Sequence, residues 1–157
     1  MSVQGKLNQK LPLFLDILEE AQKSDNPVAV LKKAIAADVR VTAILGYSVN
    51  PRFKLPLPEG IPPYRPSDVP TGLAEVELLH QHKLIMMMFD ANVRAVKKEE
   101  LFVKWLEAMC ELEAKILVAI KDQDLVSMYP KLTHHVIVEA LGWDKAVFDK
   151  MKQDSKQ

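Results

Sequence analysis

The first residues that could carry chemistry are Glu77 and His80, which lie three positions apart on a predicted helix. A Glu-x-x-His pair is a ligand pattern of di-iron helical bundles, where a second such pair and two further glutamates complete the site. The sequence contains no second pair. His80 and His82 lie about 200° apart around a helix, so they do not converge on one metal ion. The sequence therefore predicts neither a metal site nor a bound cofactor.

The residues that could act as nucleophile and base are equally isolated. Cys110 is the only cysteine and stands beside Glu111, and a neighbouring carboxylate disfavours the thiolate that a nucleophile needs. His134 and His135 begin a predicted helix, and no spacing joins them to Cys110 in a triad. The five glycines are dispersed, without a P-loop or a dinucleotide-binding fingerprint. These features predict that the protein is not an enzyme.

The composition is that of one globular domain. The chain has 157 residues, of which 48% are hydrophobic and 27% charged, which is enough apolar material for a core without a disulfide or a metal. A single cysteine excludes an intrachain disulfide. We expect one helical domain over residues 1–157, divided into N-terminal helices (1–50), a proline-rich strap (51–72) and C-terminal helices (73–157).

Charge and hydropathy weaken two classes of partner. Lys and Arg total 21 and Asp and Glu total 21, so the chain lacks the basic excess of a nucleic-acid binder, although a local patch stays open. The strongly apolar run Leu84–Phe89 is too short to span a bilayer, and the first ten residues are polar. We therefore expect a soluble protein in a reducing compartment, with no membrane partner.

Apolar spacings of three and four predict a mostly helical chain before the strap. We expect a well-buried first helix with Pro12 in its first turn. A second helix should begin at Pro27, capped by Asp25 or Asn26. A third, capped by Asp38, should run through Leu45, with Gly46 at its C-terminal end.

After the strap, Thr71 or Gly72 should open a second helical half, giving about seven or eight helices in all. A long helix is expected from Leu73 to Phe89, and two more at Lys97–Met109 and Glu111–Asp122. Thr133 should cap a short helix, His134–Leu141, that Gly142 ends. Asp144 should cap the last helix, which runs to about Lys152.

The strap contains seven of the ten prolines, so neither a regular helix nor a central strand fits there. We expect an extended, polyproline-II-like segment with a turn at Pro58-Glu59-Gly60. Its apolar residues favour an ordered segment that crosses the helices and joins two helical subunits. The side chains expected to insert into the helices are Phe53, Leu57, Ile61 and Tyr64.

Met86, Met87 and Met88, followed by Phe89, span almost every direction of one helical turn. Two interpretations stay open: a fully enclosed core helix, or a helix with at least one methionine facing outward. Because methionine adapts to irregular contact surfaces, an outward methionine would be a candidate protein contact.

The strap and its flanks also carry a family resemblance. Ala43–Lys54, followed by Leu57-Pro-Glu-Gly-Ile-Pro-Pro-Tyr-Arg-Pro66, resembles a family of small uncharacterised proteins of large contractile-tailed bacteriophages. Glu100–Met109 and Ala114–Asp122 are similar in order and spacing, and the resemblance covers roughly residues 25–143. The chain departs from the family in an extra helix after Gly142 and a longer N-terminal helix. The resemblance implies a phage accessory or virion protein and offers no catalytic residue to transfer.

We therefore expect a non-enzymatic, phage-encoded helical protein that binds a host or viral protein, in the host cytoplasm or in the virion. One alternative is a structural component of the virion. Another, less supported by the balanced charge, is an accessory nucleic-acid-binding protein of phage replication or transcription.

Overall fold

The computed structural model of the protein describes residues 13–70, 73–74 and 76–155. Within those residues the chain forms eight α-helices and no strand, which confirms the all-α prediction. Pro12, and Thr71 with Gly72, lie outside the described residues. The α-helices are α2 (Phe14–Lys23), α3 (Pro27–Ala37), α4 (Val39–Val49), α5 (His82–Ile85), α6 (Ala95–Ala108), α7 (Glu111–Lys121), α8 (His134–Leu141) and α9 (Lys145–Ser155). Short 3-10 helices are η1 (Pro51–Phe53), η2 (Leu78–Gln81), η3 (Met86–Phe89) and η4 (Leu125–Ser127).

Most of the predicted helix starts are confirmed, because each is set by a local cap. The Asn26 side chain accepts a hydrogen bond from the Ala29 amide at 3.2 Å, and Asp38 accepts one from the Arg40 amide at 3.0 Å. Thr133 caps α8 in the same way, Gly142 ends it in the left-handed conformation (φ 78°), and Asp144 caps α9.

The predicted end of the third helix is wrong, because α4 continues through Gly46 to Val49. The Asn50 amide donates to the Gly46 carbonyl, so Gly46 is an interior residue of α4. The ring of Trp143 lies 4.0 Å from the place that a Cβ on Gly46 would occupy, which is an ordinary van der Waals distance. The helix ends at Asn50, whose side chain accepts a hydrogen bond from the Arg52 amide and caps η1 ahead of Pro51.

The predicted long helix from Leu73 to Phe89 is also wrong in its first part. Helical structure begins only at Leu78, because Glu77 is extended and the Leu78 amide donates to the carboxylate of Glu113 on α7 at 3.1 Å. From Leu78 the segment runs as a 3-10 turn, one α-helical turn and another 3-10 turn. A partner distant in sequence therefore decides where this helix starts.

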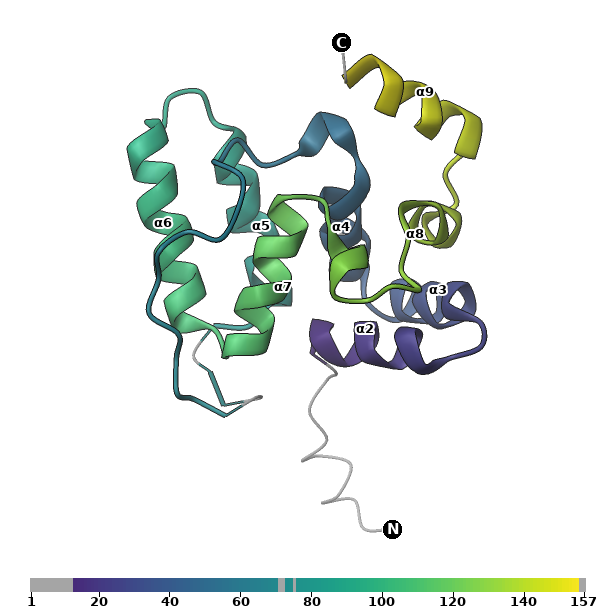
Figure 1. Cartoon of the computed structure of the whole chain (residues 1–157), viewed down its shortest axis with the longest axis horizontal. Coiled ribbons are helices and arrows are strands. Elements are labelled where there is room, and N and C mark those ends of the chain that lie inside the picture. Colours follow the sequence, from purple (N-terminus) through teal and green to yellow (C-terminus); the bar gives the residue numbers. More distant parts are fainter. Residues whose placement is uncertain (1–12, 71–72, 75, 156–157) are drawn as a thin grey trace.

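The buried apolar side chains form one cluster, to which helices before and after the strap contribute. In Figure 1, α7 lies between α6 and α4, while α3 lies beside α2 and α8. The strap was expected to join two helical subunits within one domain, and the helices on its two sides also pack on each other directly, α3 on α8 and α4 on α7. The helices of the described residues include none with the length and apolar character that crossing a bilayer requires.

Candidate functional site

The strap leaves the end of α4 and runs over α6 in Figure 1. Three hydrogen bonds tie it to the helices. The Lys121 ammonium donates to the Pro58 carbonyl at 2.7 Å, and the Gly60 amide donates to Asp122 at 3.2 Å. The Arg65 amide donates to the Glu107 carboxylate at 2.8 Å. The predicted ordered, crossing segment is thus present. It is held by Glu107 of α6, Lys121 of α7 and Asp122, which follows α7.

Lys121 is the central fastening of the strap. Its side chain is only 2% exposed, and its ammonium lies 2.5 Å from an oxygen of Asp122. A buried ammonium needs both a counter-charge and hydrogen-bond acceptors to offset its lost hydration. Asp122 supplies the first and the Pro58 carbonyl a further acceptor, so the strap completes the solvation of this lysine.

Two of the four strap side chains that were expected to insert into the helices do so, and two do not. Leu57 and Tyr64 are half-buried and pack against the core as predicted, whereas Phe53 is 50% and Ile61 79% exposed. Exposed and half-buried residues alternate from Ile61 to Arg65, so Ile61 and Tyr64, three residues apart, differ in burial; the three-residue period of polyproline II would place them on one side. Phe53 belongs to η1 and instead meets Phe89 edge-on, with ring centroids 6.0 Å apart. The deepest insertion is Leu55, which is 3% exposed.

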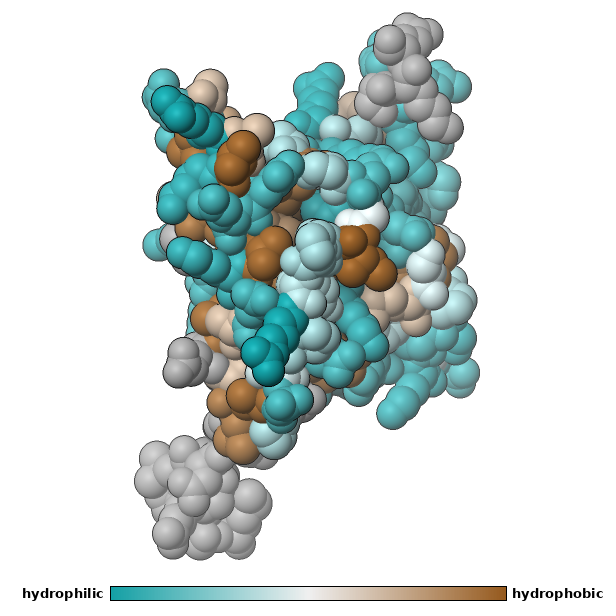
Figure 2. Space-filling model, turned by 60° about the vertical axis from the view of Figure 1, so that its left-hand side comes forward, coloured by the Kyte–Doolittle hydropathy of each residue, from teal (hydrophilic) through white to brown (hydrophobic). Residues whose placement is uncertain are grey.

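Two grooves flank the strap, and Ile61, Pro62 and Pro63 form the ridge between them. The groove against α6 has a volume of about 640 Å³, and the groove against α7 about 570 Å³. On the face turned forward in Figure 2, apolar side chains form separate patches within a hydrophilic surface.

The methionines divide between surface and core. Met86 is 61% exposed and Met87 43% exposed, whereas Met88 is fully buried. The interpretation with outward methionines thus fits Met86 and Met87, and Met88 is removed from the candidate contacts. Phe89, 37% exposed, stacks on Tyr47 and extends the same apolar surface.

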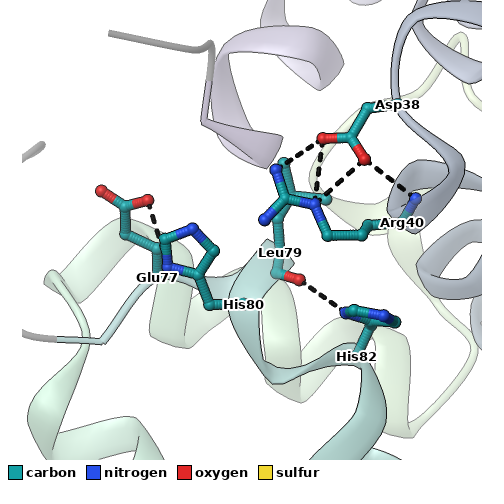
Figure 3. A network of polar contacts seen from close by, with 6 residues as sticks. All are labelled: Asp38, Arg40, Glu77, Leu79, His80 and His82. Atoms are coloured by element: carbon teal, nitrogen blue, oxygen red, sulfur yellow. Dashed lines mark hydrogen bonds and ion pairs between the residues drawn. The ribbon is translucent and has the colours of Figure 1, made fainter.

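The Glu77–His80 pair belongs to a polar network near the start of α4 (Figure 3). A Glu77 oxygen lies 3.7 Å from Nδ1 of His80, and the His82 ring hydrogen-bonds with the Leu79 carbonyl at 3.0 Å. The two imidazoles point to different partners. Among the described residues no group of three or more potential ligands is arranged to hold a metal ion.

The other polar group in Figure 3 is a tight ion pair at the start of α4. Two oxygens of Asp38 accept hydrogen bonds from the Arg40 guanidinium at 2.7 to 3.1 Å. These bonds hold the pKa of Asp38 below its ordinary value and raise the pKa of Arg40. The pair fixes the α4 terminus and leaves Asp38 satisfied.

Cys110 and the neighbouring pair His134 and His135 lie in separate parts of the chain and contact different partners. Cys110 is buried at the start of α7. His134 hydrogen-bonds with the Gln123 carbonyl and His135 with Asp149, both at 2.8 Å. Burial lowers the pKa of His134. The two histidines thus connect α8 to the preceding loop and to α9.

The model of a family of unknown function, DUF6433, matches residues 13–127. The chain belongs to this family. No curated protein and no solved structure matches the chain.

The DUF6433 region contains the strap, α6 and α7, and ends at η4. The ridge, both grooves and the Lys121 fastening are therefore all within it, apart from Met128 at the margin of the α7 groove. Helices α8 and α9 follow the DUF6433 region and close the molecule around Phe148, which is fully buried.

Sequence reasoning missed one further residue of the DUF6433 region, Glu113. It is 1% exposed, and besides the Leu78 amide its carboxylate lies near Glu77 and Asp16. Burial, more than any neighbour, raises its pKa to about 7. A glutamate in the first turn of a helix ordinarily signals a favourable dipole interaction at the surface, so its sequence position gave no sign of burial. Lys121 was hidden in the same way at the other end of α7.

Proposed function

We propose that the chain is a non-enzymatic accessory protein that binds a protein partner through the strap ridge and its grooves. The observation that carries this proposal is Ile61, a branched apolar side chain 79% exposed on a segment tied down on both sides. Exposed apolar surface held in a fixed shape is typical of interaction sites.

The fixed strap favours binding because association then orders little further chain. Lys121 and Asp122 hold the strap before Ile61, and Glu107 holds it at Arg65. A partner that covers Ile61 and Pro63 gains apolar burial without the entropic cost of ordering a flexible loop. Ile61 alone could contribute about 1.5–3 kcal/mol when buried.

The family resemblance supports a setting for this activity. Because the strap motif resembles that of a phage family, the proposed partner is a host or viral protein in an infected bacterium. The exposed Met86 and Met87 provide a second, adaptable apolar contact in the same proposal.

The experiment compares three tagged proteins in infected cells: wild type, Ile61→Asp and Val39→Asp. Val39 is a matched control, since it is 78% exposed and lies at the start of α4. We expect affinity purification with quantitative mass spectrometry to recover a partner with wild type and Val39→Asp that Ile61→Asp loses. Equal recovery by all three proteins, each shown to be folded by circular dichroism, would contradict the proposal.

A second measurement separates a host partner from a virion partner. Mass spectrometry of purified phage particles would detect the chain if its partner is a virion protein. A nucleic-acid role predicts instead binding to DNA or RNA that weakens steeply with salt. If Ile61→Asp binds DNA or RNA as strongly as wild type does, and this binding weakens steeply with salt, a nucleic-acid-binding function would replace the proposed one.

A further inference from the structure

The groove between the strap and α6 has a helical wall of regular composition. Val96, Glu99, Val103 and Glu107 line it from α6 at spacings of three and four residues, so they share one face of that helix. The floor and opposite wall contribute the apolar side chains of Phe102, Leu57 and Ile61, together with Glu59, which is paired with Lys54. Valines thus alternate with carboxylates along a groove of about 640 Å³.

The charge along this groove is mainly negative. Glu99 and Glu100 are both exposed, and the ion pairs of the described residues include neither of them. Glu107 accepts a hydrogen bond from a neutral amide and so keeps its charge. Of the two lysines that line the groove, Lys121 is already neutralised by Asp122, which leaves Lys104 against the acids.

The groove on the other side of the strap differs in this respect. Two of its carboxylates are paired with a lysine: Glu111 with Lys115 at 3.4 Å, and Asp122 with Lys121. Asp124 accepts a hydrogen bond from the neutral Ser127 hydroxyl and, like Glu107, keeps its charge. Among the described residues, the α6 groove therefore has three acids outside any ion pair, Glu99, Glu100 and Glu107, and the α7 groove has one.

We propose that the α6 groove receives an amphipathic segment of the protein partner, with apolar side chains on one face and Lys or Arg beside them. This inference rests on the proposed function and specifies the chemistry of the partner. The apolar side chains would lie on Val96, Val103 and Ile61, and the basic side chains would meet Glu99, Glu100 and Glu107. Helices bind grooves of this kind by such alternate contacts, and a phosphate backbone would be repelled by the same acids.

The test uses two labelled helical peptides of about 18 residues, which make about five turns. Both carry leucine along one face, and the remaining positions carry lysine in one peptide and glutamate in the other. We expect fluorescence anisotropy to show binding of the leucine–lysine peptide alone. Replacing Glu99 and Glu100 together by lysine should weaken that binding about tenfold, because two attractions become repulsions.

Matched controls locate the binding site on the molecule. Glu20→Lys with Asp25→Lys makes the same change of charge at two exposed positions near the end of α2 and should leave the affinity unchanged. Val96→Asp should weaken binding, whereas Val147→Asp on α9 should not; the two valines are 66% and 57% exposed. Equal binding of both peptides, or equal loss in the control reversal, would overturn the inference.

The outcomes separate this inference from the proposed function. If a purified partner requires Ile61 but is indifferent to Glu99 and Glu100, the proposed function stands and the amphipathic basic occupant is wrong. If no partner requires Ile61, the proposed function fails, whatever the peptides do.

Discussion

Glu113 and Lys121 are two charged residues of α7 that the fold removes from water, with exposures of 1% and 2%. Each connects α7 to a segment without regular helix: Glu113 to the start of η2, Lys121 to the strap. The two residues work in opposite electrostatic conditions. Lys121 has a carboxylate beside it, whereas the charged neighbours that affect Glu113, Glu77 and Asp16, are themselves acidic. Ionised Glu113 is therefore costly, and ionised Lys121 is supported.

The pH dependence of stability should report Glu113. Its pKa is raised from 4.5 to about 7 in the folded protein, so the folded state binds the proton more tightly than the unfolded state. The stabilisation is fully present below pH 4.5, decreases above it and is lost as the pH rises through 7, on the order of 3 kcal/mol. We expect Glu113→Gln to gain stability relative to wild type between pH 5 and 8 in urea denaturation.

The control for this measurement is Glu111→Gln, on the same turn of α7 but 52% exposed. Its stability should parallel that of wild type over the same range. His134, whose pKa is lowered, titrates with the opposite sign, but it is common to all three proteins and cancels in the differences. Parallel curves for wild type and Glu113→Gln would contradict the assigned burial of this carboxyl.

The role of Lys121 in holding the strap can be tested by amide hydrogen exchange in the strap. Lys121→Met keeps an unbranched apolar stem but removes the hydrogen bond to Pro58 and the partner of Asp122. A hydrogen bond to a charged group is worth about 1.5–3 kcal/mol, so amide exchange at Gly60 should accelerate roughly tenfold or more. Lys115→Met, at an exposed ion pair of α7, is the control and should leave the exchange rate unchanged.

At the level of elements, the strap is anchored by residues that a linear sequence does not distinguish. Exposed and half-buried side chains alternate from Ile61 to Arg65, with a period of two and not the three of polyproline II. The phase of this alternation depends on where Lys121, Asp122 and Glu107 hold the chain. The sequence identified an ordered apolar strap, and the helices decide which of its side chains face inward.

Alanine substitutions along the strap should therefore destabilise the protein in a graded order. Leu55→Ala removes a buried side chain and should cost about 2–5 kcal/mol. Tyr64→Ala, at a half-buried site, should cost less but still lower the melting temperature by several degrees. Ile61→Ala should stay within about 0.5 kcal/mol of wild type because that side chain is exposed. A large loss in Ile61→Ala would contradict the assigned orientation of the strap.

At the scale of the whole molecule, the elements set by local chemistry could be predicted from the sequence. The caps at Asn26, Asp38 and Thr133 and the left-handed Gly142 involve neighbours within a few residues. The late start at Leu78 could not, because Glu113 acts on it from far along the chain. The continuation of α4 to Val49 was missed because Gly46 was interpreted as a helix end, whereas it accepts a helical hydrogen bond from Asn50. The orientation of the surface residues also could not be predicted, because only the packing places Ile61 outward and Met88 inward.

The central claim is that the strap is fixed on α6 and α7 and so presents Ile61 as part of a preformed surface. Backbone ¹⁵N relaxation of the non-proline residues of 54–66, which carry an amide proton, tests this most directly. We predict order parameters close to those of a rigid backbone, about 0.85, at Leu57 and Glu59 beside the Pro58 attachment and at Gly60 and Arg65. Values below about 0.6 over the strap, with the helices remaining rigid, would contradict it.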